Sequence, residues 1–155
     1  MTTVTDDTSM TMTMTPIRTF LCDDVEEFRA LIRIAFQGDE QIIVVGEAGD
    51  GRAGYEGVRE TQPDVVLLDL SMPDLDGLEA IPLMRRACPT AAILVLSGFS
   101  AETMGPPVQR AGGDGYVEKG ASFDEIRLAV HQAVVDRDAD RQAPAFRRWR
   151  RRRPR

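Results

Sequence analysis

Polar side chains follow four of the five short apolar runs in this chain, at the point where each run ends. They are Asp23 and Asp24 after the first run, Asp69 after the third, Ser97 after the fourth, and Glu118 with Lys119 after the fifth. If the runs are parallel strands of one sheet, their ends meet at one edge and these side chains share a crevice. Two unit charges 4 Å apart repel by about 4 kcal/mol at an effective dielectric near 20. Such a carboxylate cluster stays ionised only with a cation, and oxygen ligands favour Mg²⁺, with Mn²⁺ as an alternative.

Asp69 is the carboxylate best suited to act as a nucleophile. It follows the apolar run Val65–Leu68, where an unpaired buried charge is expensive. In the functional interpretation, a carboxylate oxygen of Asp69 attacks phosphorus while a cation neutralises the transferred group. A hydrogen-bonded structural aspartate is the alternative. Asp23 and Asp24 also have a structural alternative as caps of the first helix, because Asp24 and Glu27 have capping-box spacing.

Lys119 is the only lysine in a chain that holds 18 arginines. A composition so rich in arginine would place arginine at any interchangeable basic position, so Lys119 indicates a need for a compact ammonium. Ser97 could offer a hydroxyl to a phosphoryl oxygen, although serine after a strand is often only a turn residue.

The elements that position these side chains are indicated by the hydrophobic pattern. Several apolar runs consist of consecutive Val, Ile and Leu, which is typical of strands covered on both faces. Between them, apolar residues recur at helical spacing, and Ser122 with Glu125 and Asp76 with Glu79 mark helix starts. This alternation predicts an α/β fold with a doubly wound parallel sheet. The predicted strands cover residues 17–22, 42–45, 65–70, 91–96 and 116–117.

One segment interrupts this alternation. After the fourth apolar run, Gly105, Pro106 and Pro107 stand where a helix is expected, and none of them suits a helix interior. Because proline is tolerated in a first helical turn, we expect a short or irregular fourth helix that begins near Pro106 and is the weakest element of the fold.

The charge of the chain is unevenly distributed. The 155 residues have a net charge of −6, but residues 1–140 hold 11 basic and 25 acidic side chains, whereas residues 141–155 hold eight arginines and no acid. We expect a disordered leader at 1–15, an acidic domain at 16–138 and a disordered Arg-rich tail at 139–155. The tail could bind DNA or an anionic membrane surface, fold against its own domain, or have no role.

Other sequence features exclude several classes of protein. The longest apolar run is far shorter than the roughly 18 residues of a membrane span, and the first residues lack the basic cluster and apolar core of a secretion signal. Cys22 and Cys88 lack metal-ligand spacing and are predicted to be reduced, packed thiols. Together these features predict a cytoplasmic protein without a membrane span.

The segment Val65–Gly77, VVLLDLSMPDLDG, resembles the phosphoacceptor motif of the receiver domains of two-component response regulators. FLCDD before this segment, and LSG and GYVEKG after it, fall in the order and spacing of that family. The resemblance covers about residues 16–137 and is closest to receivers of LuxR/NarL-type transcription regulators. It implies a CheY-like, flavodoxin-like fold with strand order 2-1-3-4-5. It also implies a signalling protein that catalyses only its own phosphorylation and slow dephosphorylation, and is otherwise no enzyme.

The resemblance assigns a role to each candidate residue. The roles are the phosphoacceptor Asp69; the Mg²⁺ ligands Asp24, Asp23 through water, Asp69 and the backbone carbonyl of Ser71; the phosphate-pairing Lys119; and the switch pair Ser97 and Tyr116. Gly120 stands where the family often has a proline after a cis bond.

The resemblance also implies partners. A sensor histidine kinase or phosphotransfer protein would donate the phosphoryl group, and a downstream protein would be the target, with a homodimer through the fourth and fifth helices as a further option. The chain stops soon after its last predicted helix, without room for a helix-turn-helix. A stand-alone receiver and the receiver portion of a DNA-binding transcription regulator therefore both stay open. A metal-dependent phosphatase of the haloacid type is a remote alternative, because it needs a second aspartate where this chain has Ser71.

Overall fold

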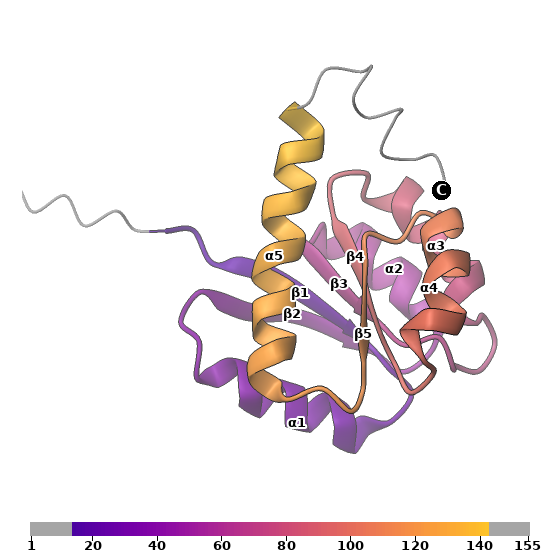
Figure 1. The fold of residues 1–155 in the computed structure, drawn as a ribbon, viewed down its shortest axis with the longest axis horizontal. Helices are drawn as coiled ribbons and strands as arrows, with labels where there is room; N and C mark the ends of the chain where they lie inside the picture. Colours follow the sequence, from indigo (N-terminus) through magenta and orange to yellow (C-terminus); the bar gives the residue numbers. More distant parts are fainter. Residues whose placement is uncertain (1–13, 143–155) are drawn as a thin grey trace, which may run out of the picture.

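The computed structural model describes residues 14–142, so most of the predicted leader and tail lies outside the described residues. Five strands and five helices alternate along these described residues (Figure 1). They are β1 (Ile17–Cys22), α1 (Glu26–Gln37), β2 (Ile42–Ala48), α2 (Gly51–Thr61), β3 (Val65–Leu68), α3 (Gly77–Ala87), β4 (Ala92–Ser97), α4 (Ala101–Ala111), β5 (Gly115–Glu118) and α5 (Phe123–Gln142).

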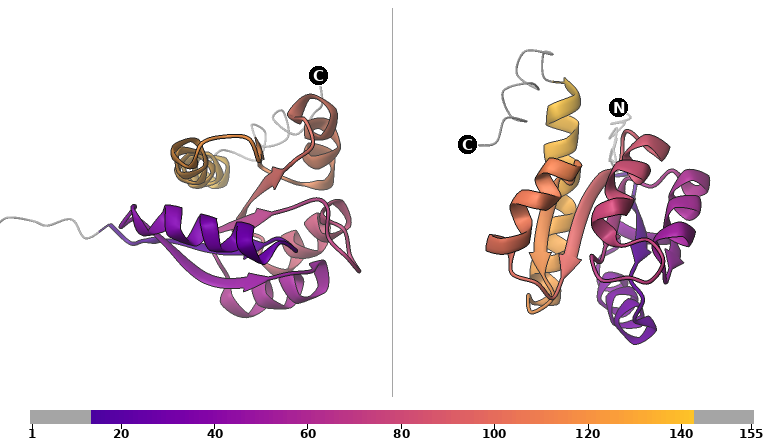
Figure 2. Two further views of the ribbon diagram at one scale, coloured as in Figure 1. Left: turned by 90° about the horizontal axis from the view of Figure 1, so that it is seen from below. Right: turned by 90° about the vertical axis from the view of Figure 1, so that its right-hand side faces the viewer.

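All strand pairs are parallel and the sheet order is β2-β1-β3-β4-β5, as predicted. β3 and β4 lie inside the sheet, and every residue of both is buried. Figure 2 shows helices on both sides of the sheet. α1 and α5 contribute to the apolar core on one face, and α2, α3 and α4 contribute to the core on the other. The consecutive apolar residues of the central strands therefore reflect burial on both faces.

The fourth helix differs from the prediction. α4 begins at Ala101, five residues before Pro106, and its 11 residues equal the length of α2 and α3. The expectation of a short helix that begins near Pro106 is therefore wrong. Two contacts stabilise the first turn. Ser100 caps it, and the backbone N–H of Ala101 donates to Glu118 Oε1, at the end of β5, at 2.8 Å. The prolines still remove two N–H donors from the interior of the helix.

The last helix extends beyond the predicted domain boundary. α5 ends at Gln142, so residues 139–142 are helical, and residues 143–155 lie outside the described part of the chain. Ser122 and Glu125 form the predicted capping box: the Ser122 N–H donates to Glu125 Oε2 at 2.6 Å, and the Glu125 N–H donates to Ser122 Oγ at 3.2 Å. Within residues 14–142, no helix combines the length and the hydrophobicity that a bilayer crossing requires.

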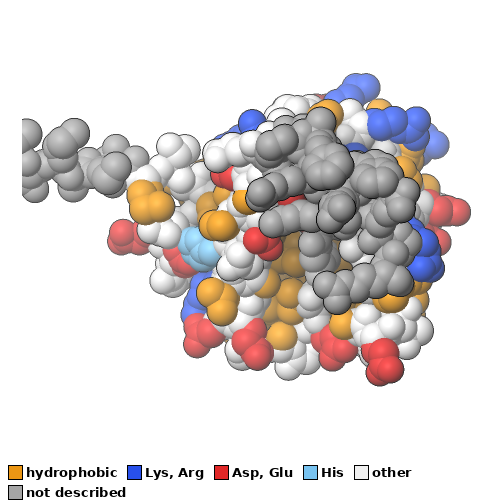
Figure 3. Space-filling view, turned by 45° about the horizontal axis from the view of Figure 1, so that its top comes forward, with side chains coloured by type: hydrophobic (Ala, Val, Ile, Leu, Met, Phe, Trp, Pro, Cys, Tyr) orange, Lys and Arg blue, Asp and Glu red, His pale blue; other side chains and the backbone are white. Residues whose placement is uncertain are grey.

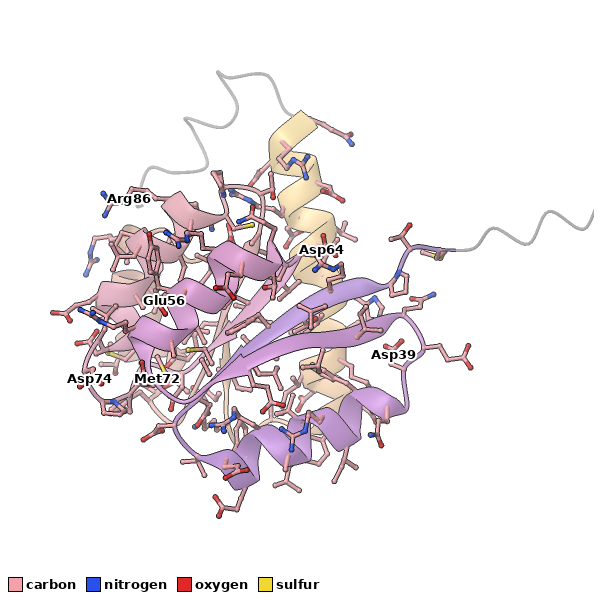
Figure 4. All side chains as sticks on the ribbon, turned by 180° about the vertical axis from the view of Figure 1, so that it is seen from behind. Asp39, Glu56, Asp64, Met72, Asp74 and Arg86 are labelled. Carbon is pink, nitrogen blue, oxygen red and sulfur yellow. The ribbon has the colours of Figure 1, made fainter. Side chains whose placement is uncertain are left out.

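The outer surface carries charged side chains of both signs. On the face shown in Figure 3, acidic side chains are spread along the lower edge and basic ones lie mainly toward the upper right. The loops at the two ends of the strands are separated by the length of the sheet. Figure 4 shows Met72 and Asp74, which follow β3, at one end, and Asp39 and Asp64, which precede β2 and β3, at the other. The candidate site lies at the end marked by Met72.

Candidate functional site

Three carboxylates meet where β1 and β3 end. One oxygen each from Asp23, Asp24 and Asp69 lies within 4.8 Å of the others. The parallel register explains this proximity, because Cys22 pairs with Leu68 and the residues after them emerge side by side. The Asp69 N–H donates to the Cys22 carbonyl at 2.9 Å and extends that alignment by one residue. Asp23 and Asp69 are buried and Asp24 is exposed, so the cluster has a closed floor and an open rim.

Lys119, at the end of β5, brings a positive charge to this cluster. Its Nζ lies 2.7 Å from Asp23 Oδ2 and 3.3 Å from Asp69 Oδ2. The Lys119 N–H donates to the Ser97 carbonyl at 2.8 Å, which ties the end of β5 to the end of β4. The peptide bond that follows Lys119 is trans, since residues 14–142 contain no cis bond. A single ammonium therefore bridges two buried carboxylates.

The titration of the site reflects this crowding. Burial, followed by the charge of Asp23, raises the pKa of Asp69, and Lys119 only partly opposes them. Burial by itself would lower the pKa of Lys119, but the hydrogen bond to Asp23 and the charges of Asp69 and Asp23 together raise it. The Lys119 amine therefore stays protonated, and the remaining negative charge of the carboxylates favours a further cation near Asp69.

The first helix is not capped as the sequence suggested. The N-cap of α1 is Val25, which makes no side-chain cap, and the capping prediction for Asp24 is wrong. The helix begins one residue later than the Asp24–Glu27 spacing implies. The Val25 N–H instead donates to Asp23 Oδ1 at 2.9 Å, so the two adjacent aspartates have different roles. Asp23 is held by the backbone and by Lys119, whereas the Asp24 side chain lies at the exposed rim.

Ser97 and Tyr116 both hydrogen-bond to the backbone of one residue in the loop after β4. The Phe99 N–H donates to Ser97 Oγ at 3.3 Å, and the Tyr116 hydroxyl donates to the Phe99 carbonyl at 2.8 Å. Ser97 is fully buried and Tyr116 is half-buried. The two predicted switch residues are therefore linked through this loop, and their switching role stays a prediction.

The loop after β3 supports Asp69 closely. The Ser71 N–H donates to Asp69 Oδ1 at 3.2 Å, which places the Ser71 backbone beside the carboxylate. That Ser71 also offers its carbonyl to a metal stays a prediction. Gly77, the first residue of α3, approaches so near that a Cβ there would lie 2.3 Å from the Asp69 carbonyl oxygen. The helix can pack against the Asp69 backbone only because this residue lacks a side chain.

Two residues of α1 contact the site but were not predicted as site residues. The ring of Phe28 lies under the Lys119 ammonium, with 4.6 Å between Nζ and the ring centroid. Arg29 donates from Nη1 to the Asp23 carbonyl at 2.5 Å and from Nε to Glu47 Oε1 at 3.0 Å. No sequence signal singled out this ring, because Phe28 also fits the apolar stripe of α1.

The donor set suits a hard divalent cation. It consists of carboxylate oxygens alone, two of them from buried residues, and the pKa of Asp69 is raised by burial and by its acidic neighbour. Oxygen-only clusters with few protein ligands and an open side are typical of Mg²⁺ sites. These residues therefore fit the ion that the sequence predicted.

The sequence profile of the response regulator receiver domain matches residues 19–131. The chain belongs to this family. Its receiver domain is 37% identical over 114 residues to the response regulator UvrY of Escherichia coli, covering 74% of this chain and 52% of UvrY. It is 33% identical over 120 residues to the nitrate/nitrite response regulator NarL of Escherichia coli, covering 77% of this chain and 56% of NarL. The chain thus spans about half the length of these curated relatives.

Solved structures agree with this assignment. A LuxR-family two-component response regulator from an Aurantimonas species superposes with a TM-score of 0.74 at 30% sequence identity, covering 79% of this chain and 87% of that one. The predicted CheY-like fold and the resemblance to LuxR/NarL-type receivers are both confirmed. The domain is a signalling domain rather than a classical enzyme.

Proposed function

We propose that this receiver domain accepts a phosphoryl group on Asp69 in a Mg²⁺-dependent reaction and changes conformation in response. The observation that supports this most directly is the Lys119 ammonium bridging Asp23 and Asp69 inside a three-carboxylate cluster. An aspartate with a purely structural role needs only one hydrogen-bond or ion-pair partner. A carboxylate cluster that already contacts one ammonium and suits a metal cation as well can bind a substrate that brings additional negative charge.

The reaction divides between the residues as follows. An Asp69 oxygen attacks phosphorus, the bond from phosphorus to the donor breaks, and the donor leaves with that bonding pair. When bound by Asp23, Asp24, Asp69 and the Ser71 carbonyl, Mg²⁺ would neutralise charge on the phosphoryl oxygens. Lys119 pairs with one of those oxygens, and the Ser97 hydroxyl donates to another.

The physiological donor in this proposal is a phosphohistidine on a sensor kinase or phosphotransfer protein. The family membership supports this class of partner. We also propose a cytoplasmic location. Cys22 and Cys88 are buried and unpaired, and burial, with the charge of Asp50 next in weight, raises the pKa of the Cys22 thiol to about 12. Neutral, unpaired thiols are typical of proteins in a reducing compartment.

The test is phosphorylation of the purified chain by acetyl phosphate, followed by intact-mass spectrometry. We expect one added phosphoryl group with Mg²⁺, none with EDTA, and none in Asp69→Asn. The matched control is Asp74→Asn, an exposed aspartate in the same loop whose φ of 67° an asparagine adopts readily. Phosphorylation of Asp69→Asn at the wild-type level would refute the assignment of Asp69.

A second candidate concerns the output. Because the chain spans about half of UvrY and NarL, we propose that its receiver controls a DNA-binding region, either within a longer protein or in a partner. The haloacid-type phosphatase has less support, since Ser71 lacks a carboxylate. The test measures DNA binding across salt concentrations, with and without the arginine-rich residues 143–155. Loss of binding on truncation would assign DNA binding to those residues rather than to a separate effector region.

A further inference from the structure

The Lys119 ammonium is held by three groups from three parts of the fold. Two are the carboxylates of Asp23 and Asp69, at 2.7 and 3.3 Å. The third is the face of the Phe28 ring, 4.6 Å from Nζ. A cation within about 6 Å of an aromatic centroid is attracted by the negative face of the ring. The side chain of Lys119 is 24% exposed, so this attraction is less weakened by water than it is on an open surface.

The position of Phe28 follows from α1. The helix begins just after the aspartate pair, and Phe28 lies on the side that packs against the apolar core shared with α5. The half-buried ring also lines a small cavity together with Asp23, Asp69 and Leu96. Its inner edge is therefore fixed by packing while its face remains turned to the ammonium.

The three contacts differ in what competes for them. The Lys119 ammonium contacts Asp23 and Asp69, and both belong to the carboxylate cluster that a divalent cation would occupy, so cation binding contests both contacts. A lysine side chain has a flexible stem of four methylene groups and would spread over many rotamers once its carboxylate contacts were lost. The Phe28 ring carries no charge and ligates no metal, so neither the cation nor a phosphoryl group competes for it.

We propose that Phe28 is a positioning residue for phosphorylation: its ring holds the Lys119 ammonium beside Asp69 when the cation engages the carboxylate cluster. This inference rests on the proposed function. It concerns the aromatic character of the side chain, because a leucine or methionine would fill the same space without the negative face that attracts the amine.

A double-mutant cycle tests this proposal on the intact chain. The rate of phosphorylation by acetyl phosphate at saturating Mg²⁺ is measured for the wild type, Phe28→Leu, Lys119→Met and the double variant. A cation–π contact of roughly 0.5–2 kcal/mol corresponds to a rate loss of roughly 2- to 30-fold in Phe28→Leu. In the Lys119→Met background we expect Phe28→Leu to have no further effect.

Conservative variants separate positioning from packing. Phe28→Tyr keeps the ring and should stay within about twofold of the wild-type rate, whereas Phe28→Met should lose as much as Phe28→Leu even if its thermal midpoint is unchanged. An equal loss from Phe28→Leu in both Lys119 backgrounds, or a wild-type rate in Phe28→Met, would overturn the proposal while leaving the role of Asp69 intact. A wild-type rate in Lys119→Met would overturn both this proposal and the part that the proposed function gives to Lys119.

Discussion

Replacing Lys119 with methionine should make folding of this domain depend on a divalent cation. Methionine keeps most of the length and apolar contact of the lysine stem but removes the charge. The side chains of Asp23 and Asp69 are 8% and 4% exposed, so water replaces little of the lost ion pairing. The variant leaves two buried carboxylates facing each other without a cation.

The size of the effect follows from the geometry. The carboxylate oxygens of the cluster lie within 4.8 Å of one another, and at that separation two unit charges repel by about 3–4 kcal/mol at an effective dielectric near 20. Protonation of Asp69 relieves part of this, because its pKa is already raised by burial and by Asp23. We therefore expect the free energy of unfolding to fall by about 2–4 kcal/mol in EDTA at neutral pH.

Mg²⁺ and acid should each reduce this loss. A cation that binds the native cluster stabilises it by mass action, and it should stabilise Lys119→Met more than the wild type, in which the amine competes for Asp23. A carboxyl whose native pKa is raised destabilises the fold above that pKa and ceases to do so as it takes up a proton. The gap between wild type and variant should therefore narrow as the pH falls through the raised pKa of Asp69.

The assay is urea unfolding followed by far-UV circular dichroism, with EDTA or with saturating Mg²⁺. Arg86→Met is the matched control, since Arg86 is exposed on α3 (Figure 4) and its loss removes one positive charge away from the cluster. A variant at Lys119 as stable as Arg86→Met in EDTA, or a stability gap that Mg²⁺ leaves unchanged, would refute the reasoning.

Three further predictions concern the framework around the site. Gly77→Ala should lower the free energy of unfolding by about 2 kcal/mol or more in urea titrations, because its Cβ would overlap backbone atoms, whereas Gly98→Ala, with open space around its Cβ, should be neutral. Thr19→Val should raise the thermal midpoint by removing a buried hydroxyl that has no hydrogen-bond partner among the described residues, a gain of about 1 kcal/mol; a lower midpoint would contradict this. The hydrogen bond from His131, at 2.7 Å, lowers the pKa of Asp39. In acid titrations of the free energy of unfolding, Asp39→Asn should therefore be less stable than the wild type above the ordinary carboxyl pKa, and the difference should vanish as the pH falls through the lowered pKa.

Much of the site was predictable because its residues stand at strand ends. In a parallel sheet every strand ends at the same edge, so Asp23, Asp69 and Lys119 meet there although they are far apart in the sequence. The order of the strands was predictable only through the resemblance to receiver domains. The pattern of apolar runs indicates a doubly wound sheet but does not say which strands are neighbours.

The two errors in helix starts have different physical causes. Pro106 and Pro107 indicate a helix break, yet α4 forms its first turn, which Ser100 caps and in which the N–H of Ala101 donates to Glu118, 17 residues later. Asp24 has the spacing of a cap, but α1 begins one residue later while the backbone of Val25 bonds to Asp23. The Glu118–Ala101 contact joins residues far apart in the sequence, whereas the Asp23–Val25 contact joins residues two positions apart and is a local turn that competes with the cap.

The sequence alone determined the chemistry available to this protein: the types of the acidic, hydroxyl and amino side chains, and the runs that bury the strands carrying them. Only the tertiary structure decided how those groups share their charges. It placed the Lys119 amine between two buried carboxylates and against the Phe28 ring, and it gave the adjacent residues Asp23 and Asp24 different surroundings. The physical reason is that distances of 3–5 Å between side chains depend on rotamers, register and packing across the sheet, whereas residue type and order along the chain constrain only which elements can meet.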